Sequence, residues 1–90
     1  DISGAIESFN RVLAIDPHHV DSLCNLGHCV TLQSVQSGEF PAAIEFCKRA
    51  LAIEPHNVCA LFNLGTAYFR PGNLPGAIES YNRALAIDPP

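Results

Sequence analysis

The chain has 90 residues, of which 48% are hydrophobic, and its nine Asp and Glu residues outnumber its five Lys and Arg residues to give a formal net charge of −4. Nucleic-acid binding draws on clustered Lys and Arg, so this balance argues against a nucleic-acid partner. No apolar run approaches the roughly 20 residues that a membrane-spanning helix needs, so we expect a soluble segment without membrane contact.

The first predicted element belongs to a segment that occurs three times. It reads GAIESFNRVLAIDP at 4–17, AAIEFCKRALAIEP at 42–55 and GAIESYNRALAIDP at 76–89, at offsets of 38 and 34 residues. Apolar residues fall at i, i+4, i+7 and i+8 of each copy, which is the stripe of an amphipathic helix. We therefore expect three equivalent helices in an all-α repeat array, in which each unit packs on its neighbours.

Two further helices are predicted between these segments, from Val20 to about Leu32 and from Val58 to about Arg70. Their apolar residues again follow a helical stripe. Asn57 precedes the second of them and is a favourable N-cap. The chain is thus expected to contain five helices.

A glycine lies inside each of these two helices. Because Gly costs a helix roughly 0.8 to 1 kcal/mol relative to Ala, its presence there points to a packing requirement. We expect Gly27 to let its helix approach the backbone at Ala43, and Gly65 to do the same at Ala77. Facing small residues would bring the two helices of a unit into close antiparallel contact.

These positions together resemble the tetratricopeptide repeat. The later unit carries the pattern at Leu61, Leu64, Gly65, Tyr68, Gly72, Ala77, Tyr81, Ala84 and Pro89. The earlier unit carries it at Leu23, Leu26, Gly27, Val30, Gly38, Ala43, Cys47, Ala50 and Pro55. The resemblance implies an α-solenoid of antiparallel helix pairs, about two and a half repeats long, with the first helix of each pair on the concave side of a superhelix.

The array divides into 1–19, the second helix of a truncated repeat, 20–57, a repeat with a four-residue insertion, and 58–90, a regular repeat. The insertion falls within 31–37 and corresponds to about one helical turn. We predict that the first helix of that unit runs a turn longer and projects from the edge of the stack, with a looser inter-helix turn as the alternative. Because the chain lacks Met and opens inside a repeat, we expect a fragment of a longer array, or self-association through its end helices.

The binding surface of such an array is expected on the concave side, at residues of the first helices that lie outside the core stripe. The candidates are Cys24, Asn25, His28, Leu32, Phe62, Asn63, Thr66 and Phe69. Asn25 and Asn63 occupy equivalent places, and a side-chain amide matches the donor and acceptor of a peptide group. This arrangement resembles the asparagine ladder in the repeats of O-linked N-acetylglucosamine transferases, and solvent-facing Asn residues are the alternative. Phe62 and Phe69 offer apolar surface to a peptide or helix, or else pack against an adjacent unit.

Other kinds of site find little support. The carboxylate clamp found in this family needs cations, and the matching positions hold Cys24, His28 and Cys59 instead. The same three residues are not expected to bind a metal, because a structural zinc needs four ligands and usually a paired C-x-x-C. No phosphate loop and no nucleophile with an oriented base can be recognised, so neither catalysis nor a cofactor is predicted. Four scattered cysteines suit the cytoplasm or another reducing compartment.

The sequence therefore predicts a protein-interaction module that holds an extended peptide or a partner helix in its concave groove. A structural scaffold or self-assembly element, with contacts made by the end helices and the insertion, is the first alternative. A substrate-recruiting arm of a larger enzyme is the second, because the resemblance to sugar-transferring enzymes allows it.

Overall fold

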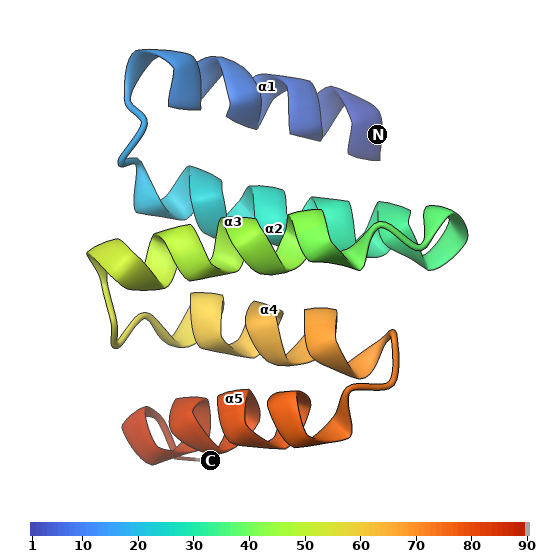
Figure 1. Ribbon diagram of the computed structural model, residues 1–90. Coiled ribbons are helices and arrows are strands. Elements are labelled where there is room, and N and C mark those ends of the chain that lie inside the picture. The colour runs from blue at the N-terminus through green and yellow to red at the C-terminus, as the bar shows by residue number, and fades with distance from the viewer. Residues whose placement is uncertain (90) are drawn as a thin grey trace.

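The computed structural model describes residues 1–89, which form five α-helices. They are α1 (Ile2–Ile15), α2 (Val20–Ser37), α3 (Phe40–Ile53), α4 (Val58–Phe69) and α5 (Leu74–Ile87). Each helix packs antiparallel against the next one in the chain, and α2 also packs against α4 (Figure 1). The predicted all-α stack of paired helices is confirmed.

The first helices of the two complete units begin with equivalent caps. The predicted N-cap Asn57 accepts a hydrogen bond from the Ala60 N–H through its Oδ1 at 2.9 Å. His19 has the same role in α2, where its Nδ1 accepts from the Ser22 N–H at 3.2 Å. Such caps satisfy N–H groups that no helical carbonyl reaches, so both helices start in the same register. Gly38 ends α2 with a φ of 77°, in the left-handed region that favours glycine.

The inserted residues lengthen α2. This helix has 18 residues, whereas the equivalent helix α4 has 12. The insertion therefore continues the helix, as predicted, and does not loosen the turn. Thr31 lies on its buried side and donates a hydrogen bond to the Gly27 carbonyl at 2.8 Å, whereas Leu32 and Val35 are exposed. Figure 1 shows the end of α2 extending beyond the turn that joins α4 to α5.

The core lies along the seam between the first and second helices of each unit. Leu23, Leu26 and Leu61 are fully buried there. The second helices contribute mainly small side chains, namely Ala43, Cys47, Ala50, Ala77 and Ala84. Small residues on one side and leucines on the other bring the paired helices close together.

Both helical glycines lie at these close approaches, although one prediction about them is wrong. A Cβ atom at Gly27 would meet the Cys47 Sγ at 2.7 Å and the Ala43 carbonyl oxygen at 3.5 Å, as the expected approach to Ala43 requires. At Gly65 the nearest atoms belong to the Tyr81 ring, also at 2.7 Å, and not to Ala77. The reason is that α5 carries a bulky tyrosine where α3 carries Cys47, and the ring fills the space above the glycine.

Two buried thiols make the fold sensitive to alkaline pH. Burial raises the pKa of the Cys24 thiol from 9.0 to about 12 and raises the pKa of Cys47 equally, because a thiolate there would lose its hydration. In the unfolded chain both thiols ionise at the ordinary pKa. Their contribution to stability is therefore fully present below about pH 9 and is lost as the pH rises to about 12.

We expect the midpoint of urea unfolding to fall steadily when the pH is raised above about 9. The physical reason is that the unfolded state gives up protons that the folded state retains. In the Cys47→Ala variant one of the two thiols is gone, so its midpoint should fall less over the same pH range. Equal midpoints at about pH 8 and about pH 11 in the unaltered chain would contradict this expectation.

Candidate functional site

The predicted binding residues belong to α2 and α4, and all of them except Cys24 are exposed or half-buried. We use the name α2–α4 wall for the set Asn25, His28, Leu32, Phe62, Asn63, Thr66 and Phe69. Within it, α2 contributes three exposed residues, and α4 contributes two exposed aromatic and two half-buried polar residues. α2 packs directly against α4, and the Asn63 Nδ2 reaches the backbone of α2.

Cys24 does not belong to this surface. The sequence placed it among the groove residues, but its side chain is buried and packs in the core cluster with Leu23 and Leu26. Its Sγ lies 3.6 Å from the Asn57 Oδ1, to which it donates. The reason is that α4 closes over this position of α2, so the thiol is inaccessible to a partner.

The Asn63 amide is already engaged within the chain. Its Nδ2 donates to the Cys24 carbonyl at 3.1 Å and contacts the Cys59 Sγ at 3.6 Å. This bond ties α4 to the backbone of α2. The Asn63 Nδ2 is therefore already used as a donor, and the predicted pair of hydrogen bonds to a peptide group is incomplete here. The Asn63 Oδ1 is left as an acceptor, whereas Asn25 is exposed and presents its whole amide.

Phe62 is exposed but held in place by α5. Its ring centroid lies 5.1 Å from that of Tyr81, and the two rings are tilted by 59°. The Tyr81 hydroxyl in turn shares a hydrogen bond of 2.8 Å with the Thr66 hydroxyl. This tilted arrangement is favourable for aromatic pairs, and the hydroxyl pair fixes the supporting ring. Tyr81 of α5 thus contacts both Phe62 and Thr66, two of the predicted binding residues.

The same repeat units identify the family. The model of the tetratricopeptide repeat matches residues 34–90, which is more than half of the chain. The chain belongs to the tetratricopeptide repeat family. No curated protein matches it. Tetratricopeptide repeats generally mediate protein–protein interactions and are typically non-catalytic, which agrees with a surface of apolar side chains and amides.

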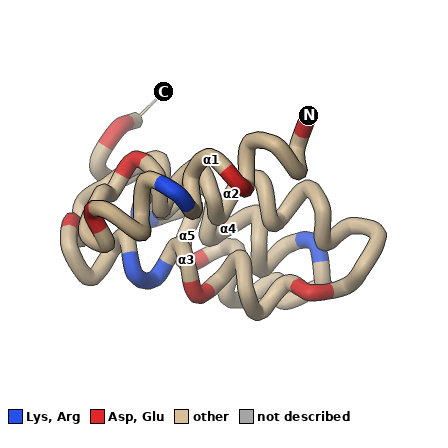
Figure 2. Tube along the Cα trace, turned by 90° about the horizontal axis from the view of Figure 1, so that it is seen from above, with Lys and Arg blue, Asp and Glu red and all other residues tan. Residues whose placement is uncertain are grey.

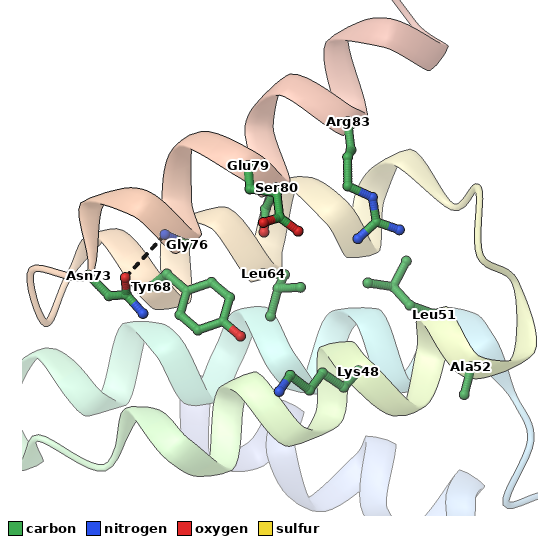
Figure 3. Close-up of a pocket in the computed structure, with 10 residues that line it drawn as sticks. All are labelled: Lys48, Leu51, Ala52, Leu64, Tyr68, Asn73, Gly76, Glu79, Ser80 and Arg83. Atoms are coloured by element: carbon green, nitrogen blue, oxygen red, sulfur yellow. Dashed lines mark hydrogen bonds between the residues drawn. The ribbon is translucent and has the colours of Figure 1, made fainter.

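This tetratricopeptide segment also has a hollow that was not predicted. It measures about 400 Å³ and lies between α3 and α5, which do not pack against each other among the described residues, with α4 as its floor. Figure 3 shows Lys48 on one wall and Arg83 on the other, with the Tyr68 ring at the end of the hollow near Asn73. Nothing in the repeat pattern reveals this α3–α5 groove, because Lys48 and Arg83 are not equivalent positions and only the crossing of the helices brings them to one hollow.

The remaining surface of the repeat shows no strong charge pattern. Lys and Arg are few and are interspersed with Asp and Glu along the trace (Figure 2). Within residues 1–89 no cluster of three or more His, Cys, Asp or Glu is arranged to hold a metal ion. None of the described helices is long and apolar enough to cross a membrane.

Proposed function

We propose that this tetratricopeptide segment is a protein-interaction module whose α2–α4 wall holds an extended peptide or a partner helix. The observation that carries the proposal is Phe62, which is 56% exposed although the Tyr81 ring supports it. A large apolar side chain that is both accessible and fixed loses little entropy on binding. Aromatic side chains of this kind supply much of the affinity in protein interfaces.

The surroundings of Phe62 suit a polypeptide. Leu32 and Phe69 extend the exposed apolar surface along α2 and α4. Asn25 offers a donor and an acceptor, and the Oδ1 of Asn63 offers a second acceptor beside it. In our proposal the apolar residues contact side chains of the partner, while the two amides hold its backbone.

The wall carries no Lys or Arg, so a partner that depends on a terminal carboxylate or a phosphate gains little from it. Uncharged segments with aromatic or aliphatic side chains suit it better. We further propose that the chain works in the cytoplasm or another reducing compartment. The support for this is that Cys24, Cys29, Cys47 and Cys59 are all free thiols.

Replacing Phe62 by Ala is expected to weaken peptide binding by about 2 kcal/mol, which is about 30-fold in Kd. The probes are peptides of about 12 residues, long enough to follow both helices, selected from a random display library on the unaltered chain. Their affinities for the variant are then measured by calorimetry. Asn25→Ala is expected to cost about 1 kcal/mol, the usual contribution of one hydrogen bond.

The matched control is the double variant Lys48→Ala with Arg83→Ala, which alters the α3–α5 groove and leaves the wall intact. We expect it to bind the same peptides within about twofold of the unaltered chain. If Phe62→Ala and Asn25→Ala keep the original affinity, the wall is not the binding surface. If instead the control abolishes binding, the peptides lie in the α3–α5 groove.

A further inference from the structure

The first and last helices of the chain have almost the same sequence. Residues 4–17 and 76–89 differ at only two of fourteen positions, Phe9 against Tyr81 and Val12 against Ala84. Despite this near identity, α1 packs against the helix that follows it and α5 packs against the helix that precedes it. The two helices therefore bury different faces, which overlap at Ala5 and Phe9 of α1 and at the equivalent Ala77 and Tyr81 of α5.

Two apolar residues that α1 packs against the core are left exposed at the equivalent positions of α5. In α1, Leu13 is only 9% exposed and packs together with Ile6 against the core cluster that includes residues of α2. The identical residues of α5 are Ile78 and Leu85, which are 58% and 49% exposed. An apolar surface that fits α2 is thus present twice in the chain and occupied once.

These two residues are part of a larger apolar surface. We call it the end face, and it consists of Phe62, Phe69, Leu74, Ile78 and Leu85, all of them exposed. The matching residues of the preceding unit are buried or half-buried beside α4, namely Cys24, Thr31, Phe40, Ile44 and Leu51. The repeat itself therefore shows what covers such a surface: the first helix of a unit, in the orientation of α4.

We propose that the end face of one copy of this chain binds α2 of a second copy, in the place that α1 of the second copy otherwise occupies. α5 presents to α2 the same Ile and Leu at the same spacing as α1 does, so the contacts of Ile6 and Leu13 are reproduced. The contact extends the array without interruption, because α2 of the second copy follows α5 of the first copy in the same way that α4 follows α3 within one chain. Since the contact is head to tail, it adds further copies in an open series.

The exchange also adds contacts that α1 cannot provide. The end face includes Phe62 and Phe69 of α4, whereas α1 meets α2 alone. Within the chain, the Asn63 Nδ2 donates to the Cys24 carbonyl at 3.1 Å, which joins the first helices of the two units. In the proposed contact, Asn25 of the second copy is equivalent to Asn63, and Phe62 of the first copy is equivalent to Cys24. In the joined copies the exposed Asn25 amide therefore gains the Phe62 carbonyl as its acceptor.

The competition between α1 and a second copy makes the exchange depend on concentration. α1 is tethered to α2 by a short turn, which gives it an effective concentration of the order of millimolar or above. Release of α1 from α2 is favoured by the conformational entropy that α1 regains, because docked α1 is ordered along its whole length. The α5 helix of the incoming copy is already ordered by its packing on α4.

The first test uses the unaltered chain at increasing concentration. We expect sedimentation equilibrium to show a growing average mass, and hydrogen exchange of the same samples to show that amides of α1 lose protection as the mass rises. Simple end-to-end contact without exchange would leave α1 protected. A chain that stays monomeric, or that associates while α1 stays protected, overturns the proposal.

The second test uses equivalent substitutions in the two helices, whose effects should have opposite signs. Leu85→Asp places a charge in the end face and is expected to weaken association at least about tenfold. Leu13→Asp weakens the competing α1 and is expected to strengthen association by a similar factor. Asn82→Asp and Asn10→Asp make comparable changes at exposed positions of α5 and α1, and we expect neither to alter the mass distribution.

If Leu13→Asp leaves association unchanged or reduces it, the exchange is wrong, and a symmetric contact between two α5 helices accounts for the loss in Leu85→Asp. The hydrogen-exchange measurement needs no variant, so it decides the matter even if a substitution prevents folding. Peptide binding by dilute Leu85→Asp monomer tests the α2–α4 wall separately. Phe62 and Phe69 belong to both surfaces, so the two proposals are told apart by Leu13 and Leu85, which lie outside the α2–α4 wall.

Discussion

The Leu61→Ala variant is expected to lose about 3 kcal/mol of the free energy of unfolding, within a range of about 2 to 5 kcal/mol. Leu61 is fully buried in α4, and α4 packs against α2, α3 and α5. Because three helices surround the site, the cavity left by the lost atoms cannot close without moving one of them. For a domain whose total stability is about 5 to 15 kcal/mol, this is a large fraction.

Urea unfolding followed by circular dichroism measures the effect. Leu32→Ala is the matched control, since it makes the same chemical change in α2 at a residue that is 41% exposed. We expect this control to change the free energy of unfolding by less than about 0.5 kcal/mol. Equal losses in the two variants would show that Leu61 is not enclosed as described.

Replacing Gly27 by Val is expected to destabilise the chain by about 2 to 3 kcal/mol. The new Cβ would lie 2.7 Å from the Cys47 Sγ, and its methyl groups would press on backbone atoms of Ala43 and Cys47 that are 3.5 to 3.6 Å from it. A side chain can turn away, but the backbone of α3 cannot, so the two helices of the unit must separate. Thermal and urea unfolding of the variant report the loss.

Gly4→Val is the control for the intrinsic effect of the substitution on a helix. A Cβ at Gly4 meets only the Asp1 side chain, at 3.5 Å, so we expect a change of less than about 0.5 kcal/mol. Adding Cys47→Ala to Gly27→Val removes the closest contact and is expected to restore part of the loss. Full restoration would indicate that the backbone approach contributes nothing, and no restoration would place the strain elsewhere.

The helical architecture follows from the sequence because its determinants are local. The apolar stripes of the repeated segment and the Asn57 cap each specify structure within a few residues. The added turn in α2 was also predictable, because four extra residues match a helical turn and the stretch contains no further helix breaker before Gly38. These features needed no knowledge of which helix lies beside which.

The candidate site was less predictable because it depends on contacts between units. Cys24 and Phe62 hold equivalent positions, yet Cys24 is covered by α4, whereas Phe62 lies on α4 itself and is exposed. Asn25 and Asn63 likewise match in sequence, but only Asn63 has a preceding first helix beside it, whose Cys24 carbonyl accepts from its amide. Equivalent positions in two repeats therefore predict the direction in which a side chain points. Whether that side chain is accessible depends on which helix packs beside it.

The lengthened α2 has a consequence for any segment bound to the α2–α4 wall. In an array of identical units the first helices all begin at one rim of the inner surface and all end at the other, so the two rims already differ. Here the added turn raises a ledge on one rim, with Leu32 and Val35 exposed on it. The two rims therefore also differ in shape. A polypeptide that crosses the surface from its N- to its C-terminus meets different surroundings from one that crosses in the opposite direction.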